Sequence, residues 1–302
     1  MTIQLFEFQI AGLVQVSGED ALPYLQSQLT IDLKKLPIGG HRLGLRLSLK
    51  GRVLFGAQII RGGEEEFLLI CQHTDSETII GLLEENVVAD EVEFSAVPGD
   101  WKEAVLYHPT SASEALKLIG VQSLSPGYAV HLGEGWGYFD ATLPTGSLSV
   151  LMPQNQPVSW AANLPSPHPS ELEHLRLLAG RFRPVTEVGK DEFPQEGGLE
   201  KTAVDFDKGC YLGQEVMARI HAMGRVRNQA MGVKGAGPLQ AQLPVRLLNQ
   251  GKQVGTLKSQ FPMPHTDEWV GAAVIHENAI PLLASEGLQL EGTEHTLQPL
   301  HR

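Results

Sequence analysis

The sequence predicts an α+β fold with a small β-barrel at its C-terminal end. Amphipathic helices and alternating strands are mixed along the first 227 residues, which is typical of largely antiparallel sheets covered by helices. After Asn228 short apolar runs are separated by glycine and proline, a pattern typical of a small barrel or sandwich. We therefore divide the chain into an α+β region, 1–227, with a further division into 1–98 and 99–227 as an option, and a β-barrel domain, 228–302.

The composition limits the class of protein. The chain has 302 residues, of which 42% are hydrophobic and 19% charged, as in an ordinary soluble globular protein. A net charge of −12 argues against a broad nucleic-acid surface. No apolar run has the length of a membrane helix, and the first ten residues lack the features of a signal peptide. We expect a cytoplasmic protein that binds neither membranes nor nucleic acid directly.

The elements of the first 98 residues follow from hydrophobic periodicity. A strand at 11–16 precedes a helix that begins near Asp20, where Pro23 fits the first turn. Leucines alternate with other residues from Leu43 to Leu49, which predicts a half-buried strand. Further strands are predicted at 53–60, 67–71 and 92–97, with a helix capped by Asp75 between the last two. Cys71 ends an apolar run and is assigned to the core.

A second, weaker cycle of elements follows. Strands are predicted at 104–107 and 128–132, with a helix at 113–119 between them. Five prolines between 153 and 169 indicate a loop. Ser170 and Glu173 form a predicted capping box that opens a helix ending at Gly180. The long loop at 184–204 is rich in acidic residues, and long ordered loops are often functional.

The octet KGCYLGQE, residues 208–215, is the main candidate for chemistry. It contains Cys210 between two glycines, with Lys208 two residues before it and a helix predicted directly after it. A nearby cation and a helix N-terminus both favour the reactive thiolate. The alternative is a cysteine packed at a strand-to-helix corner, because free cysteine is among the most buried residue types.

The charges around this octet are one-sided. Between 208 and 227 the cations Lys208, Arg219, Arg225 and Arg227 accompany His221, and Glu215 stands among them. Such a cluster binds carboxylates, such as the glutamyl tail of a folate, or the phosphates of an RNA partner. The alternative is a helix face paired by salt bridges with the acidic loop 187–200.

Metal ligation and hydrolysis are two other chemistries open to a cysteine such as Cys210. Its spacing from His221 fits no compact zinc pattern, and an iron–sulfur cluster usually needs four thiolates, whereas the chain has two cysteines. No permanently bound metal is therefore predicted. A cysteine hydrolase would need a histidine base, and His221 would lie about 15 Å along a helix. A different histidine, distant in sequence but close in space, could instead serve as the base of a hydrolase.

The octet resembles the K-G-C-Y-x-G-Q-E signature of the YgfZ family, folate-binding relatives of the glycine-cleavage T-protein that are linked to iron–sulfur enzymes. The likeness extends to 16–21, 25–32, 193–195 and 221–224, and more weakly to 254–256. It implies a T-protein (aminomethyltransferase)-like folate-binding fold. It also implies an accessory protein of iron–sulfur cluster assembly or repair that affects tRNA modification through its client enzymes. The implied ligand is tetrahydrofolate or a derivative, and the implied partners are iron–sulfur client or assembly proteins.

The resemblance also assigns residues. Cys210 would be the functional thiol, tuned or positioned by Lys208, Glu215 and Arg219. The folate would contact polar residues at the end of the first helix and near the octet: Gln28, Thr30, Asp32, Gln195, Tyr211 and Gln214. On residue types alone, the polar cluster at the end of that helix is a solvated C-terminal turn.

A folate-dependent aminomethyltransferase is the alternative function. T-protein relatives use an aspartate just after the glycine turn of the second strand to engage the folate. The corresponding run, Gly51 to Ala57, contains no acidic residue. We therefore expect the T-protein-like fold without appreciable aminomethyltransferase activity.

Overall fold

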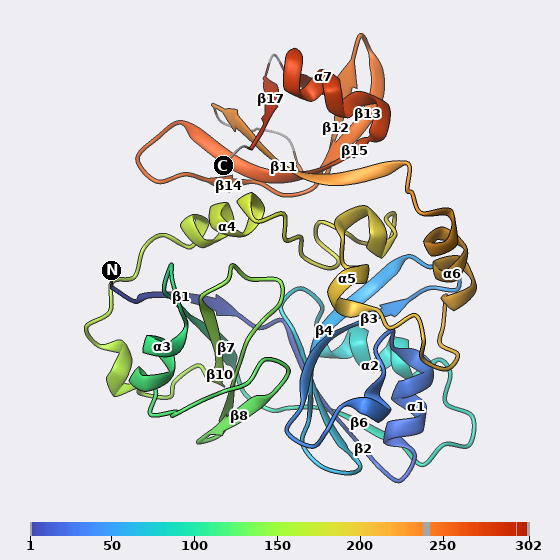
Figure 1. Cartoon of the computed structure of the whole chain (residues 1–302), viewed down its shortest axis with the longest axis vertical. Coiled ribbons are helices and arrows are strands. Elements are labelled where there is room, and N and C mark those ends of the chain that lie inside the picture. The colour runs from blue at the N-terminus through green and yellow to red at the C-terminus, as the bar shows by residue number, and fades with distance from the viewer. Residues whose placement is uncertain (1, 238–241, 294, 301–302) are drawn as a thin grey trace.

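Two five-stranded antiparallel sheets and a β-barrel form the part of the chain that the computed structural model describes, residues 2–237, 242–293 and 295–300 (Figure 1). The two sheets lie side by side and the barrel lies across one end of both (Figure 1). The α+β class and the C-terminal barrel predicted from the sequence are confirmed.

The first sheet has the order β3-β4-β5-β2-β6. Its strands are β2 (Gly12–Ser17), β3 (His41–Leu47), β4 (Val53–Arg61), β5 (Glu66–Cys71) and β6 (Glu93–Ala96). Helices α1 (Ala21–Gln28) and α2 (Ser76–Glu84) pack their apolar side chains onto it, and Cys71 lies in this core as predicted. The Asp75 side chain accepts from the Thr78 N–H at 2.8 Å, so the predicted cap of α2 is confirmed. A short 3-10 turn, η1 (Leu33–Lys35), follows α1.

The second sheet has the order β1-β7-β10-β9-β8. Its strands are β1 (Gln4–Gln9), β7 (Trp101–Tyr107), β8 (Ala129–Leu132), β9 (Gly135–Tyr138) and β10 (Ser147–Pro153), with helix α3 (Ser113–Leu118) beside them. Sequence periodicity did not identify β1, β9 or β10. β1 pairs with β7, whereas β2 begins only three residues after β1 and joins the other sheet. The optional division at residue 98 stays a prediction. It would place β1 in the unit 1–98, although β1 pairs with β7 in the sheet formed by later residues.

The connection between sheets and barrel contains η2 (Ser159–Ala161), α4 (Pro169–Leu178), η3 (Pro194–Gly197), α5 (Glu200–Ala203) and α6 (Gln214–Met223). The predicted Ser170–Glu173 capping box is wrong. His168 is the N-cap of α4, its ring Nδ1 accepts from the Ser170 N–H at 3.3 Å, and Pro169 takes the first turn. Gly180 follows the end of α4 at φ +63°, as predicted.

The barrel begins at Asn228. Its strands are β11 (Asn228–Ala236), β12 (Val245–Asn249), β13 (Lys252–Leu257), β14 (Phe261–Pro262), β15 (Glu268–His276), β16 (Leu288–Leu290) and β17 (Thr296–Pro299), with η4 (Glu277–Ala279) and α7 (Ile280–Ser285). Pairing of β11 with β15 closes the sheet. Ala230, Val270 and Ala272 pack outward onto Leu177 and Val188. The barrel and the connection therefore share one apolar core.

None of the helices in the described ranges is both long enough and apolar enough to cross a membrane.

Candidate functional site

Lys208 anchors the octet to the end of α1. Its side chain is buried, and Nζ donates to the carbonyl oxygens of Gln26 at 2.7 Å, Leu29 at 2.6 Å and Ile31 at 2.6 Å. A helix leaves its last carbonyls without intrahelical partners, and a cation there is favourable. Burial lowers the pKa of Lys208 to about 8. The three carbonyls occupy all three ammonium protons, so Lys208 holds the octet against the end of α1, and its tuning or positioning of Cys210 stays a prediction.

The two cysteines lie in opposite environments. Cys210 is exposed, whereas Cys71 is buried and burial raises the pKa of its thiol. The alternative of a packed corner cysteine is therefore wrong for Cys210. Helix α6 begins at Gln214 after Gly213, which has φ +82°. A Cβ on Gly213 would lie 2.6 Å from the Ser48 carbonyl oxygen, so glycine lets this segment seat on the turn after β3.

The polar residues after α1 mostly bond within the protein. The Thr30 hydroxyl donates to the Ala203 carbonyl and accepts from the Leu45 N–H at 2.9 Å. The Asp32 carboxylate accepts from Gln26 Nε2 at 3.0 Å and pairs with Lys35 at 3.1 Å. These bonds fix the loop after α1. They leave Thr30 and Asp32 little capacity for the ligand contacts expected of them.

Three other expected ligand residues do retain capacity. Within the described part of the chain, the side-chain oxygen Oε1 of Gln28, Oε1 and Nε2 of Gln195 and the Tyr211 hydroxyl are buried without hydrogen-bond partners. Leaving such a group unsatisfied costs about 1–3 kcal/mol, which a polar ligand could offset. Gln214 is half-buried in the first turn of α6, and Glu215 and Arg219 are exposed on that helix. Of these residues only Arg219 lines a cavity described below, the third one beside α6.

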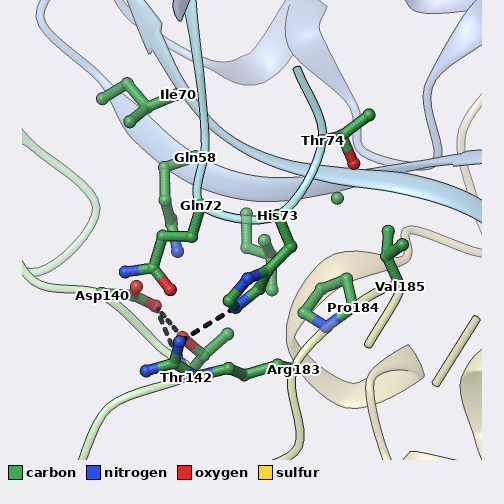
Figure 2. Close-up of a pocket in the computed structure, with 12 residues that line it drawn as sticks. Gln58, Ile70, Gln72, His73, Thr74, Asp140, Thr142, Arg183, Pro184 and Val185 are labelled. Atoms are coloured by element: carbon green, nitrogen blue, oxygen red, sulfur yellow. Dashed lines mark hydrogen bonds between the residues drawn. The ribbon is translucent and has the colours of Figure 1, made fainter. Parts of the chain in front are cut away.

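A small polar cavity of about 30 Å³ lies between the two sheets (Figure 2). Gln58 comes from β4, Gln72 and His73 follow β5, Asp140 and Thr142 follow β9, and Arg183 follows α4. Asp140 accepts from the Thr142 N–H at 2.6 Å and its hydroxyl at 2.7 Å, and Arg183 Nη1 lies 2.9 Å from His73 Nε2. The cavity has room for water but not for a folate.

Buried titratable groups surround this central cavity. Burial and the neighbouring Asp140 raise the pKa of Glu103, which accepts from the Tyr138 hydroxyl at 3.0 Å and from Gln72. Burial also raises the pKa of Asp140. Burial, reinforced by Arg183, lowers the pKa of His73 to about 4. Burial therefore favours the neutral form of the His73 imidazole and of the Glu103 and Asp140 carboxyl groups.

Val185, which also lines the central cavity, has a strained backbone. Its φ is +73°, a region that β-branched residues rarely adopt. Its N–H donates to the Val188 carbonyl at 2.9 Å, which closes a tight turn directly after Arg183. Strain of this kind costs about 1–3 kcal/mol and is concentrated at functional sites.

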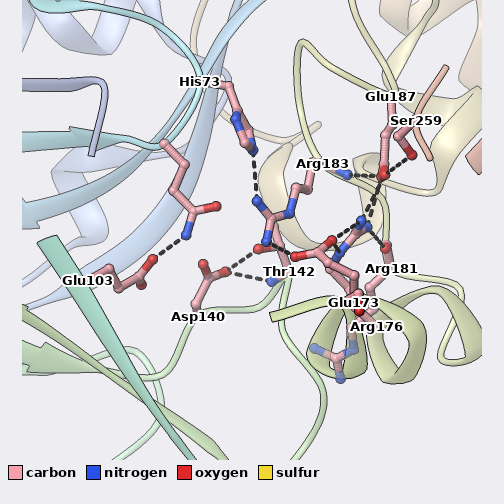
Figure 3. Close-up of polar contacts among 12 residues, drawn as sticks. His73, Glu103, Asp140, Thr142, Glu173, Arg176, Arg181, Arg183, Glu187 and Ser259 are labelled. Carbon is pink, nitrogen blue, oxygen red and sulfur yellow. Dashed lines mark hydrogen bonds and ion pairs between the residues drawn. The ribbon is translucent and has the colours of Figure 1, made fainter. Parts of the chain in front are cut away.

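A buried network of ion pairs holds the Arg183 side chain in position (Figure 3). Arg183 pairs with Glu173, which also pairs with Arg176 at 2.6 Å, and Arg176 pairs with Glu187 at 2.7 Å. Ser259 of the barrel donates to Glu187 at 2.7 Å. The position of Arg183 is therefore coupled to α4, to the loop 184–204 and to the barrel.

A second cavity of about 750 Å³ adjoins the central one and shares Leu43 and Asp140 with it. Its wall includes the apolar Leu116 and Phe139 beside the polar Arg181 and Thr202. Arg181 Nη1 donates to the Ala141 carbonyl at 2.6 Å, which fixes the guanidinium. The volume and the mixed lining suit a ligand of folate size.

Sequence reasoning missed both cavities. Each contributing segment supplies one or two polar residues without a motif, and only the packing of the two sheets brings them together. No group of three or more histidine, cysteine or acidic side chains in the described ranges is placed to hold a metal ion.

Residues 1–126 match the family model described as the GCVT N-terminal domain. A tRNA-modifying protein YgfZ from Pectobacterium atrosepticum is 24% identical, over 99% of this chain and 90% of that protein. A putative chloroplastic transferase from Arabidopsis thaliana is 27% identical over 82% of this chain. An iron–sulfur cluster assembly factor IBA57 homolog from Pyricularia oryzae is 25% identical over 72%. The alignments cover only 59% and 54% of these last two proteins.

A solved structure has the same fold. The glycine cleavage system aminomethyltransferase T from Bartonella henselae superposes with a TM-score of 0.75, at 18% identity, over 99% of this chain and 85% of that one.

Proposed function

This chain is a YgfZ-family protein with the T-protein fold, and we propose from this premise that it is a folate-binding accessory protein of iron–sulfur cluster assembly or repair, with Cys210 as its functional thiol. The observation that carries the proposal is the setting of Cys210. Its thiol is exposed on a segment that is fixed on one side by Lys208 and on the other by Gly213. An accessible thiol on an anchored segment is suited to reaction with, or ligation by, a partner.

The thiol would act on clients rather than hold a cluster alone. Cys71 is buried, which leaves Cys210 as the accessible cysteine, and clusters usually need four thiolates. Effects on tRNA modification would follow through iron–sulfur client enzymes. We also propose that the protein acts on iron–sulfur client proteins, is cytoplasmic and does not contact nucleic acid directly.

Complementation tests the thiol. In a bacterial strain that lacks its own YgfZ, the wild-type chain should restore the activity of an iron–sulfur tRNA-modifying enzyme. Cys210→Ser should fail to restore it, and purified Cys210→Ser should melt within a few degrees of wild type because the site is exposed. Alkylation followed by mass spectrometry should label Cys210 before Cys71. Full complementation by Cys210→Ser would remove the thiol from the function.

We place the reduced folate in the cavity of about 750 Å³, because the central cavity of about 30 Å³ is too small. Phe139 offers an apolar wall to a planar ring, and Arg181 a cation to a carboxylate. Calorimetric titration with tetrahydrofolate should give saturable binding that weakens about tenfold or more in Phe139→Ala. Phe94→Ala, a half-buried phenylalanine of the other sheet, is the matched control. Unchanged affinity in Phe139→Ala would exclude this cavity.

A folate-dependent aminomethyltransferase is the second candidate. β4 offers no carboxylate between Val53 and Ala57, but Asp140 places one in the central cavity. Burial raises the pKa of Asp140 and so favours its neutral acid form. A neutral carboxyl group is poorly suited to binding a cation. We expect no folate-dependent release of ammonia in a reconstituted glycine-cleavage assay. Robust release that Asp140→Asn abolishes would favour the transferase.

A further inference from the structure

A third cavity, of about 460 Å³, lies beside the C-terminal half of α6. We propose that it binds a small organic anion that carries two or more carboxylate or phosphate groups on an apolar skeleton. Its lining includes four arginines, Arg52, Arg219, Arg225 and Arg227, together with apolar side chains and the buried Glu196. Cys210 does not line this site, and the site shares no lining residue with the two cavities described above. Its ligand therefore does not depend on the placement of folate proposed above.

Three of the four arginines lack an internal partner. Arg219, Arg225 and Arg227 are exposed, and among the described residues none of their guanidinium groups makes a hydrogen bond or an ion pair. The chain has 35 acidic and 23 basic residues, so acidic partners are abundant. Three unneutralised guanidinium groups around one cavity in such a protein indicate an anion from outside.

The acidic loop 187–200 does not supply that anion. Three of its five acidic residues pair with other cations: Glu187 with Arg176 at 2.7 Å, Glu192 with Lys258 at 2.7 Å, and Glu196 with Arg52 at 3.7 Å. Within the described ranges, the other two, Asp191 and Glu200, form no ion pair with Arg219, Arg225 or Arg227. The alternative drawn from the sequence, a helix face paired by salt bridges with this loop, is therefore wrong for Arg219, Arg225 and Arg227.

Contacts within the protein hold Arg52 and Phe193, which also line the cavity. The Arg52 guanidinium lies 3.5 Å from the centre of the Phe193 ring and donates to the Asp191 carbonyl at 2.6 Å. Glu196 is buried, accepts from the Phe193 N–H at 2.9 Å and from Asn228 Nδ2 at 2.9 Å. The Arg52 cation is therefore already held in place, and a ligand would need to order only the exposed arginine side chains.

The chemistry of the ligand follows from the lining. Four guanidinium groups and a single carboxylate leave a surplus of positive charge that suits a ligand with two or three negative charges. Each planar guanidinium group can donate two hydrogen bonds to a carboxylate or a phosphate. Ile220, Val226 and the exposed Met223 add an apolar surface for a carbon skeleton. The volume lies within the range of small-molecule sites.

Titration calorimetry of the full chain at constant ionic strength tests the site with three probes: citrate, triglutamate and adenosine triphosphate. We expect at least one probe to bind saturably, and Arg219→Gln or Arg225→Gln to weaken it about tenfold or more. Arg246→Gln is the control, because Arg246 is exposed in the barrel and pairs with Glu291 at 3.5 Å. Binding of triglutamate and citrate alone would identify a carboxylate ligand, and binding of the triphosphate alone a phosphate ligand.

A second variant separates binding from folding. Met223 is 65% exposed, so Met223→Glu should keep the melting temperature and, by repulsion, abolish probe binding. The proposal is overturned if no probe binds saturably, if Arg246→Gln weakens binding as much as Arg219→Gln, or if Met223→Glu binds like wild type.

Discussion

At the scale of single residues, Gly213 is the position where the backbone most constrains the thiol segment. It has φ +82°, and a Cβ there would meet the Ser48 carbonyl at 2.6 Å. We expect Gly213→Ala to lower the free energy of unfolding by about 1–3 kcal/mol, measured by urea denaturation. Gly209→Ala is the matched control because a Cβ there meets no atom within 4 Å. Equal losses in both variants would contradict this role for Gly213.

Glu103 should make stability depend on pH. Burial raises its pKa in the folded protein above the ordinary value of 4.5, so the folded state holds its proton more tightly than the unfolded state. The stabilisation from this proton is fully present below pH 4.5 and is lost as the pH rises through the folded-state pKa. Glu103→Gln, which stays neutral, should therefore gain stability relative to wild type as the pH rises.

Thermal melts between pH 4.5 and 8 measure this difference. Glu64→Gln, an exposed glutamate, is the control and should follow wild type at every pH. A gap between Glu103→Gln and wild type that stays constant with pH would show that Glu103 has the same proton affinity in both states.

At the scale of elements, α4 and the loop 184–204 depend on one buried ion-pair network. Arg176 is fully buried between Glu173 and Glu187. Removing one partner of a buried pair leaves an uncompensated charge, so Glu187→Gln should cost about 3–5 kcal/mol of unfolding free energy. Glu291→Gln, which breaks the exposed pair with Arg246, should cost less than about 1 kcal/mol. Chemical denaturation of both variants compares them directly.

The elements also show what a sequence can predict. β3 and β5 were predictable because their apolar residues alternate or run together, and the cap of α2 was predictable from Asp75. β9 was missed because GWGY is short and half glycine. The anchored thiol segment was predictable from a contiguous octet. The central cavity was not, since Gln58, Asp140 and Arg183 come from distant segments.

At the scale of the whole molecule, the barrel completes the core of the preceding region. Ala230, Val270 and Ala272 cover Leu177 and Val188, and Ser259 bonds Glu187. We expect a chain that ends at residue 227 to bind a hydrophobic dye such as ANS and to be cleaved rapidly by protease. The full chain should do neither. A truncated chain as compact and resistant as the full one would establish 1–227 as an independent domain.

The pairing of β1 with β7 has a consequence for synthesis on the ribosome. Gln4 is opposite Tyr107 and Gln9 is opposite Lys102, so β1 finds its partner only after β2 to β6 have been made. At typical bacterial and eukaryotic elongation rates this delay is on the order of 5–20 s. During that time Leu5 and Phe6, which are buried in the finished protein, remain uncovered. We therefore expect the β1 segment to be available to chaperones that act cotranslationally, before the thiol-bearing octet leaves the ribosome.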